Sequence, residues 1–400
     1  MLSTSMTDRV TPLSPAATLA ILCLIATVGL AGSFLYLPAL PLMAASFDAS
    51  EPAAQATLTA FLLGSCVGFA LYGRAADRFG HRLAFTVAGL VFVGASVAAA
   101  LTADITQLVA ARLVQGAGSV AGIVTARATI RTSMPPERAM QAMALLTAVV
   151  SLSPAASPLI GAGVLHLADW RATFLVAAGL GLAGILGARL VLPRGMPIAA
   201  QDRPQRVEAT ILRSAQFRAA LMIGIAANAS FVVMMAATPF VFVDTFGYSP
   251  AAYAALIAII LTLFAAVALV SGRMAARVGA ARPINWAIAP IVSGAALVLA
   301  GSLFGPSPAL IALGLILLIG SMGLMVPNAH ILMLEPFPAV AGTAAGLAML
   351  ITTAGGALAI TLYSVMAAGS VAGFGLFTAC YGVSTLAGWA ALPRLKGTNP

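Results

Sequence analysis

The chain has 400 residues, of which 61% are hydrophobic and only 8% are charged, and its formal net charge is +9 at pH 7. Soluble domains carry about 25% charged residues, so this composition excludes an ordinary soluble protein and makes lipid the solvent for most of the surface. The basic residues are spread over many short loops, which argues against a nucleic-acid-binding patch. Stretches that are apolar on every face, such as 83–101 and 310–324, exclude the alternating pattern of a membrane β-barrel.

Along the chain, apolar stretches of about 20 residues predict an all-α membrane protein with twelve transmembrane helices. We expect the helix cores at 16–40, 54–73, 83–101, 106–129, 141–166, 172–192, 219–242, 251–271, 284–304, 309–333, 341–366 and 371–392. The first apolar stretch is too long for the core of a signal peptide. We therefore expect it to remain in the mature protein as an anchor.

The basic residues alternate with the predicted helices. On this layout 18 of the 20 Lys and Arg residues fall on one side of the membrane, whereas Arg171 falls on the other side and Arg112 lies within a helix. The positive-inside rule places the basic side, and with it both termini, in the cytoplasm. The sequence therefore predicts a multi-pass protein of the bacterial inner membrane with an even number of helices.

A polar stretch and an internal repeat divide the chain in two. The stretch 193–218 predicts a cytoplasmic linker between an N-terminal six-helix bundle, 1–192, and a C-terminal six-helix bundle, 219–400. The loops Gly73–Arg82 and Gly272–Arg282 share the spacings Gly-Arg and Arg-x-Gly at an offset of 199 residues. An offset of half the chain indicates duplicated parallel halves, as in secondary transporters.

The first of these loops resembles the signature that the major facilitator superfamily carries between helices 2 and 3, with His81 in place of one basic residue. The matching residues are Gly73, Asp77, Arg78, Gly80 and Arg82. Glycines let helix ends approach closely, and arginines anchor the cytoplasmic surface. The resemblance implies the major facilitator fold of two pseudo-symmetric six-helix bundles, and a loop that takes part in conformational gating.

Helices 4 and 5 extend the resemblance. Arg112 and Gln115 stand in a stretch similar to the R-x-x-Q-G-x-G pattern of the superfamily. A buried arginine is costly in a membrane, so Arg112 should face a cavity or a polar partner unless it extends to the interface. Helix 5 carries Pro154, Pro158 and Gly161 in a stretch similar to the motif of the antiporter branch, and its prolines should bend the helix.

Two further stretches, Tyr36–Pro41 and Phe337–Ala345, resemble twelve-helix drug/proton antiporters of the bicyclomycin/chloramphenicol-resistance type. The resemblance implies multidrug efflux, a secondary active export of small lipophilic or amphipathic molecules by alternating access, driven by protons. In that subfamily a carboxylate commonly precedes the Tyr-Leu-Pro stretch. Here Ser33–Leu35 occupies that place, so helix 1 offers no acid for proton coupling.

The source of coupling is therefore open at the level of sequence, because all 11 acidic residues fall near the predicted helix ends. Asp244 or Glu335 could lie deeper than the predicted boundaries. Arg112 could instead exchange its counter-ion with an anionic substrate. The chain could also be a facilitator without proton coupling. His330 could titrate near neutral pH, but we interpret it as structural.

By the same resemblance, a substrate cavity should lie between the two halves, lined by helices 1, 4, 7 and 10. The candidate lining residues are Phe34, Tyr36, Arg112, Gln115, Asn228, Phe231, Met325 and Asn328. Apolar and aromatic side chains with a few polar groups suit a lipophilic or amphipathic small molecule. Expected partners are therefore this substrate, the lipid bilayer and, if transport is coupled, protons, and the expected oligomeric state is a monomer.

Other classes of function lack support in the sequence. The three histidines are far apart, the three cysteines lie in apolar runs, and no nucleophile–base pair or phosphate-binding loop occurs. We therefore expect no enzyme activity, cofactor or metal site. A dedicated exporter or facilitator of one metabolite remains the alternative function. A membrane sensor is disfavoured because no soluble signalling domain is evident.

Overall fold

The computed structural model describes residues 14–192, 207–367 and 369–392, apart from the side chains of Asp77, Pro136, Ala339, Ala341 and Gly342. Every regular element in these ranges is helical. Twelve segments are long and apolar enough to cross a membrane, which confirms the predicted number of spans. The described part of the chain is therefore an all-helical bundle of membrane-spanning type.

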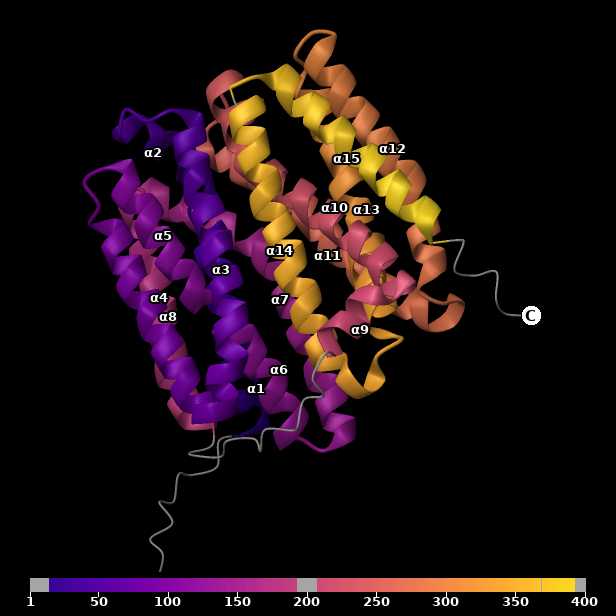
Figure 1. Ribbon diagram of the computed structural model, residues 1–400. Coiled ribbons are helices and arrows are strands. Elements are labelled where there is room, and N and C mark those ends of the chain that lie inside the picture. Colours follow the sequence, from indigo (N-terminus) through magenta and orange to yellow (C-terminus); the bar gives the residue numbers. More distant parts are fainter. Residues whose placement is uncertain (1–13, 193–206, 368, 393–400) are drawn as a thin grey trace, which may run out of the picture.

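The helices fall into two sets of six spans (Figure 1). The first set comprises α1 (Pro15–Phe34), η1 (Leu37–Ala39), α2 (Leu40–Ser46), α3 (Glu51–Phe79), α4 (His81–Ala100), α5 (Ile105–Ser119), α6 (Ala121–Ser133), α7 (Pro136–Leu167) and α8 (Arg171–Val191). The second set comprises α9 (Val207–Arg213), α10 (Ala215–Pro239), η2 (Phe240–Thr245), α11 (Pro250–Val278), α12 (Ala281–Leu303), α13 (Pro308–Leu334), η3 (Pro338–Val340), α14 (Ala341–Met366) and α15 (Val371–Ala391).

Serine sets the start of several spans. The hydroxyls of Ser14, Ser249 and Ser307 accept hydrogen bonds from the backbone N–H three residues further on, at 3.2, 3.1 and 3.5 Å. Each serine is followed by proline at the start of the helix. Proline lacks an N–H that would be unsatisfied there in any case, so it suits the first helical turn. Local sequence therefore fixes where α1, α11 and α13 begin.

Some predicted spans are interrupted in the structure. The first span runs to Ser46 instead of residue 40, and it passes through a short 3-10 helix whose first turn contains Pro38. Proline removes a helix hydrogen bond and thereby breaks the regular α-helix. The seventh span ends in the π-helix η2, which follows Pro239 directly. The fourth span changes from α5 to α6 at Val120 and continues to Ser133, beyond the predicted boundary at 129.

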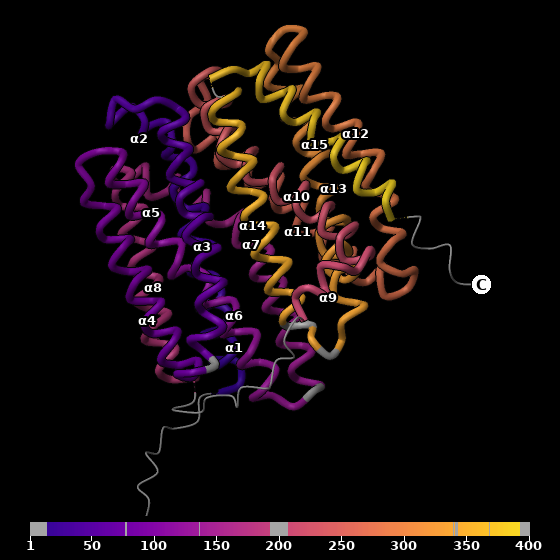
Figure 2. The backbone as a smooth tube through the Cα atoms, in the orientation of Figure 1, coloured from indigo at the N-terminus to yellow at the C-terminus, as the bar shows by residue number. Residues whose placement is uncertain are grey.

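The two halves meet along paired helices. Within the first half α3 packs against α5 and α4 against α8, and within the second half α12 packs against α13 and α10 against α14. Between the halves α3 packs against α14 and α7 against α11. Figures 1 and 2 show α3 and α14 side by side along the middle of the molecule, with the first half on the left. These two helix pairs frame the space between the halves.

Small residues allow the helices of one half to approach closely. A methyl group added to Gly64 on α3 would lie 1.9 Å from the carbonyl oxygen of Leu113 on α5. One added to Gly116 would lie 2.0 Å from the carbonyl oxygen of Phe61. Membrane helices associate through such close backbone contacts, because lipid provides no hydrophobic driving force.

The internal repeat is visible in the backbone. Gly80, after α3, has φ 81° and ψ 151°, and Gly279, after α11, has φ 83° and ψ 154°. Each glycine N–H donates a hydrogen bond to the carbonyl four residues back, on Ala76 and Ala275 respectively, at 2.9 Å in both cases. This region of φ and ψ is open only to glycine. The Gly-containing loops that match in sequence at an offset of 199 residues therefore match in conformation as well.

The predicted linker, 193–218, differs from the structure in its second part. Residues 193–206 lie outside the described residues, whereas 207–213 form α9 and α10 already begins at Ala215. Ser214 separates the two helices, and its hydroxyl accepts a hydrogen bond from the N–H of Phe217 at 3.3 Å. The sequence did not predict α9, because its composition is polar and contains arginine. Only Ile211 of this helix is buried, so the segment has no apolar pattern that would indicate a helix.

Candidate substrate cavity

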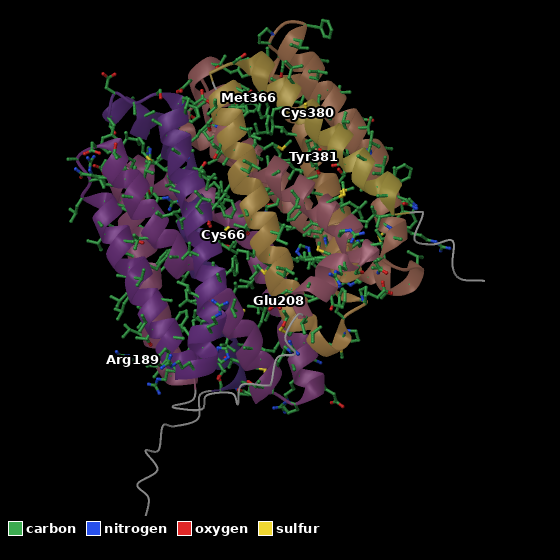
Figure 3. The ribbon with its side chains drawn as sticks, viewed as in Figure 1. Cys66, Arg189, Glu208, Met366, Cys380 and Tyr381 are labelled. Carbon is green, nitrogen blue, oxygen red and sulfur yellow. The ribbon has the colours of Figure 1, made fainter. Side chains whose placement is uncertain are left out.

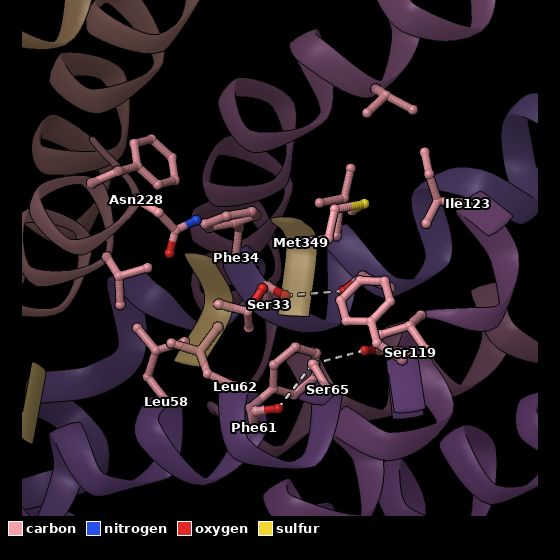
Figure 4. A pocket seen from close by; sticks show the side chains of 18 of the residues that line it. Ser33, Phe34, Leu58, Phe61, Leu62, Ser65, Ser119, Ile123, Asn228 and Met349 are labelled. Atoms are coloured by element: carbon pink, nitrogen blue, oxygen red, sulfur yellow. Dashed lines mark hydrogen bonds between the residues drawn. The ribbon is translucent and has the colours of Figure 1, made fainter. Parts of the chain in front are cut away.

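The helix bundle has two ends. The linker end carries the turns at 79–81, 133–136 and 279–281, and the opposite end carries the connection at 46–51 and the one after Met366. A cavity of about 250 Å³ lies between the halves. The first half contributes residues of α1, α3, α5, α6 and α7, and the second half contributes residues of α10 and α14. Figure 4 shows side chains from both halves around it.

The wall of the cavity is mainly apolar and aromatic. Phe34 of α1 and Phe231 of α10 meet edge to face, with ring centroids 5.8 Å apart. Phe231 also stacks on Phe264 of α11 at 6.5 Å. Leu62 and Met349 line the cavity from α3 and α14 (Figure 4). The aromatic contact between Phe34 and Phe231 joins the two halves directly, so it must change when the halves move relative to one another.

Few polar side chains reach the cavity, and several of them are already paired. Ser33 donates to the carbonyl of Gly29 at 3.1 Å, and the hydroxyls of Ser65 and Ser119 are 3.2 Å apart (Figure 4). Asn228 also lines the cavity, and its buried Oδ1 has no hydrogen-bond partner among the described residues. This oxygen lies against α14, because a methyl group added to Gly356 would come within 2.4 Å of it.

Arg127 of α6 is the charged residue that lines the cavity. Its side chain is half-buried, and no hydrogen bond or ion pair joins it to another described residue. Arg127 lies less than two turns before Ser133, where α6 ends. The sequence prediction placed it at the cytoplasmic surface, because the predicted span ended at 129. Arg127 lies on the face of α6 that lines the cavity, and α6 continues past it to Ser133.

Arg112 lies elsewhere, fully buried inside the first half. Its guanidinium carbon is 4.2 Å from the ring centroid of Tyr36 and 4.3 Å from that of Phe61. One terminal nitrogen donates to the carbonyl of Gly32 at 2.8 Å and to Oε1 of Gln115. Cation–π contacts and hydrogen bonds thus take the place of a carboxylate partner. Nε and Nη2 have no hydrogen-bond partner among the described residues.

Three of the eight predicted cavity residues line the cavity, namely Phe34, Asn228 and Phe231. The other five, which are Tyr36, Arg112, Gln115, Met325 and Asn328, are at most 1% exposed and lie within their own halves. Asn328, for example, donates to the hydroxyl of Ser271 at 2.6 Å and so ties α13 to α11. The sequence assigned these residues to the right helices but not to the face of each helix. Their contact with substrate stays a prediction.

The other predicted motif residues lie at helix contacts and helix ends. A methyl group on Gly161 of α7 would lie 1.8 Å from the carbonyl oxygen of Leu35, so this position holds α7 tightly against the end of α1. Pro154 and Pro158 lie inside α7, which continues from Pro136 to Leu167. In the predicted gating loop, Gly73 lies within α3, and Gly80 ends that helix.

The charged residues of the predicted gating loop lie on either side of Gly80. The guanidinium of Arg78 lies 5.2 Å from the ring centroid of Phe79. Arg82 lies in the first turn of α4. The side chain of Asp77 is outside the described residues. The role of the loop in gating stays a prediction.

None of the three carboxylates that lie nearest the seam lines the cavity. Asp244 and Glu335 are exposed at opposite ends of the molecule, and Glu335 accepts a hydrogen bond from Gln216 at 3.0 Å. Glu51, at the start of α3, accepts a hydrogen bond from the N–H of Gly369 at 2.8 Å. The suggestion that Asp244 or Glu335 lies deeper in the membrane therefore does not match their position.

Hydrogen bonds close the opposite end of the seam. Besides the contact between Glu51 and Gly369, the hydroxyl of Ser364 on α14 donates to Oε1 of Gln55 on α3 at 2.6 Å. Midway along the seam the thiol of Cys66, labelled in Figure 3, approaches the carbonyl of Leu350 at 3.9 Å. Among hydrogen bonds between described residues, none joins the halves at the linker end. Among the described residues, the hydrogen bonds across the seam therefore lie at the opposite end and midway along it.

A family model described as Major Facilitator Superfamily matches residues 22–360. The chain belongs to the major facilitator superfamily. With its twelve apolar spans, it is a multi-pass membrane protein of this superfamily. In fold it is similar to the crystal structure of a D-xylose-proton symporter, with a TM-score of 0.76, 18% identity and coverage of 96% of this chain and 98% of the other.

Among individual members of the superfamily, the chain is 30% identical over 247 residues to an uncharacterized transporter, YdgK, of Bacillus subtilis, covering 60% of this chain and 61% of that protein. It is 31% identical over 147 residues to the multidrug resistance protein MdtM of Salmonella typhimurium, covering 37% and 36%. The matches thus span less than two thirds of these relatives.

Proposed function

We propose that this chain exports small lipophilic or amphipathic molecules by alternating access, in the manner of a multidrug efflux transporter. The observation that carries the proposal is the mainly apolar cavity between the halves, lined by aromatic residues from both. Ligand pockets of this kind combine apolar walls with a few polar groups that orient the ligand. The similarity to a multidrug resistance protein supports the same conclusion.

The structure, with hydrogen bonds across the seam at the opposite end, corresponds to one step of the proposed transport cycle. We place the linker end in the cytoplasm on the basis of the positive-inside bias in the sequence. The hydrogen bonds of Gln55 and Glu51 then close the periplasmic end, and the cavity faces the cytoplasm. A substrate would enter from the cytoplasm, and rocking of the halves would break these bonds and release it outside.

The alternative is a transporter of the same fold that does not couple to protons, either a facilitator or a dedicated exporter of one metabolite. One observation favours it: in the described part of the chain no carboxylate lines the cavity, and Glu51 lies at the end of a span. Proton antiport through a cavity carboxylate therefore lacks a group to carry the proton. The two candidates differ in whether substrate movement dissipates a proton gradient.

The test uses proteoliposomes that contain the purified chain and a pH-sensitive dye. Efflux of a neutral amphipathic compound such as chloramphenicol should be faster than from protein-free liposomes. Dissipation of an imposed pH gradient on addition of substrate would support antiport, whereas substrate movement without it would support the uncoupled alternative. If no lipophilic or amphipathic compound moves faster than in protein-free liposomes, the export proposal is wrong.

A further inference from the structure

The charge of the cavity points to a substrate class narrower than lipophilic molecules in general. Arg127 is the charged residue in the cavity wall among the described residues, and no described carboxylate accompanies it. It has no hydrogen bond or ion pair to another described residue. A half-buried guanidinium without a counter-ion attracts anions and repels cations, because charges interact more strongly where water is partly excluded.

A second basic group lies across the seam from Arg127. His330 belongs to α13 in the second half, and its imidazole is close enough to the Arg127 guanidinium for the two groups to interact electrostatically. Its Nδ1 is 2.9 Å from the carbonyl oxygen of Val326. This imidazole is neutral or positive, so it adds no negative charge that would oppose an anion at Arg127.

The remainder of the cavity suits an apolar body. Phe34 and Phe231 form an aromatic contact further along the same cavity, and Asn228 lies beside them with an unpaired amide oxygen. A molecule with its rings near the phenylalanines and its charged group at the linker end would reach Arg127. The guanidinium is suited to planar, bidentate binding of carboxylate, sulfonate or phosphate oxygens.

We propose that this cavity selects amphipathic anions, with Arg127 binding the anionic group and Phe34 and Phe231 contacting the apolar body. The proposal rests on the export function proposed above and specifies its substrate class. The same chemistry is offered by a membrane-permeant organic acid and by the headgroup of an anionic lipid. The experiment must therefore separate these two sources.

The test measures binding to the full chain in nanodiscs of phosphatidylcholine by isothermal titration calorimetry. Three ligands share one ring system: naphthalene-2-sulfonate, 2-naphthyltrimethylammonium and the neutral 2-acetonaphthone. We expect the sulfonate to bind at least about tenfold more tightly than the ammonium, as a partly buried charge pair requires. Anionic phosphatidylglycerol in the nanodisc should leave the sulfonate affinity unchanged if the site serves soluble anions. A loss of affinity would assign the site to lipid headgroups.

The variants isolate Arg127. Arg127→Gln should lower the sulfonate affinity about tenfold and leave the ketone affinity unchanged, which also shows that the variant is folded. Arg127→Lys should retain most of the preference for the anion. Arg131→Gln is the matched control, because Arg131 lies one helical turn further along α6 and is exposed. It should bind all three ligands like the parent chain.

The outcomes separate this proposal from the export function. Equal binding of sulfonate and ammonium by the parent chain, or an unchanged sulfonate affinity in Arg127→Gln, would overturn the anion site. Export of neutral compounds in proteoliposomes would then still stand. Conversely, a clear preference for the sulfonate without movement of any compound across proteoliposomes would retain the site and overturn export.

Discussion

Arg112 and Arg127 lie on the same membrane span, Ile105–Ser133, but the residues around them differ. Arg112 on α5 is enclosed by Tyr36 and Phe61 inside the first half, whereas Arg127 on α6 faces the space between the halves. Both positions were recognisable from the sequence as arginines within or beside a span. Which of them faces the space between the halves depends on the direction of the side chain, and Arg112 instead packs against aromatic rings and polar partners of its own half. At this scale we therefore expect Arg112 to support folding and Arg127 to influence ligand choice.

The aromatic pair in the cavity provides the first prediction. Phe231→Ala removes an edge-to-face contact with Phe34, and we expect an increase of about three- to tenfold in the KM for export of an amphipathic substrate. Transport into proteoliposomes measures it. Phe304→Ala is the control, because Phe304 is 87% exposed in the turn after α12. Equal effects of the two substitutions would contradict a role for the pair in binding.

Arg112 should tolerate no replacement, not even by lysine. Lysine keeps the charge but loses the planar group that lies between the rings of Tyr36 and Phe61 and bonds Gly32 and Gln115. We expect both Arg112→Lys and Arg112→Ala to lower the thermal unfolding temperature in detergent, by an amount that corresponds to about 2 kcal/mol or more. Arg171→Lys, at a half-exposed position at the opposite end, should be nearly neutral. A parent-like unfolding temperature in Arg112→Lys would show that the charge alone suffices.

Gly279 in the second half has nearly the same backbone conformation as Gly80 in the first half. Its φ of 83° is unfavourable for any other residue, although a methyl group there would contact nothing within 4 Å. We expect Gly279→Ala to destabilise the protein by about 1–3 kcal/mol through backbone strain alone. Gly272→Ala adds a methyl group in equally open space within α11 and should stabilise by about 0.5–1 kcal/mol. Thermal unfolding of both variants in the same detergent compares them, and a neutral Gly279→Ala would refute the strain.

At the scale of elements, the helix pair α3 and α14 both holds the halves together and closes one end. The hydrogen bonds at the opposite end are few, namely those of Gln55 with Ser364 on α14 and of Glu51 with Gly369 in the turn after α14. Each hydrogen bond contributes only about 0.5–1.5 kcal/mol, so together they can hold one conformation and still break during transport. The sequence predicted both helices but not their pairing, since the residues that meet, such as Cys66 and Leu350 or Gln55 and Ser364, are 284 to 309 positions apart.

Removal of one of these bonds should shift the conformational equilibrium. Gln55→Leu leaves the hydroxyl of Ser364 without its acceptor, and we expect a larger population with the opposite end open. Spin labels at positions 42 and 310, both partly exposed at that end, should report longer distances by electron–electron double resonance in a cysteine-free background. Gln107→Leu is the control, because Gln107 bonds only within its own half, to Ala103. Identical distance distributions in the parent and Gln55→Leu would show that this bond does not hold the closed state.

At the scale of the whole molecule, the two halves repeat one another and meet mainly along α3–α14 and α7–α11, with smaller contacts of η1, α2 and α3 with α10, α11 and η2. This arrangement leaves an apolar cavity between them and one end of the seam without hydrogen bonds between described residues. Orientation in the membrane follows from charge and not from fold, because the bundle could be inserted either way. The positive-inside bias therefore carries the prediction that the linker end is cytoplasmic.

Labelling of single cysteines tests this orientation. Met140 and Leu167 are exposed near the two ends of α7, at 71% and 86%. In a chain without its native cysteines, Leu167→Cys should react with a membrane-impermeant maleimide in intact cells, and Met140→Cys should react only after lysis. The reverse pattern would place the linker end outside and invert the direction of the proposed export.

Composition and local pattern determined much of this protein without reference to the structure. Apolar runs gave twelve spans, Ser-Pro pairs mark where helices start, and the glycines at 80 and 279 mark the repeated turn. These features depend on neighbours within about one helical turn, so they are readable along the chain. Tertiary structure alone decided the rest: that α6 continues to Ser133, and that Arg127 and not Arg112 faces the cavity. In a helix that is apolar on nearly every side, no periodic pattern marks the face that meets the partner half, so only the packing of the helices selects it.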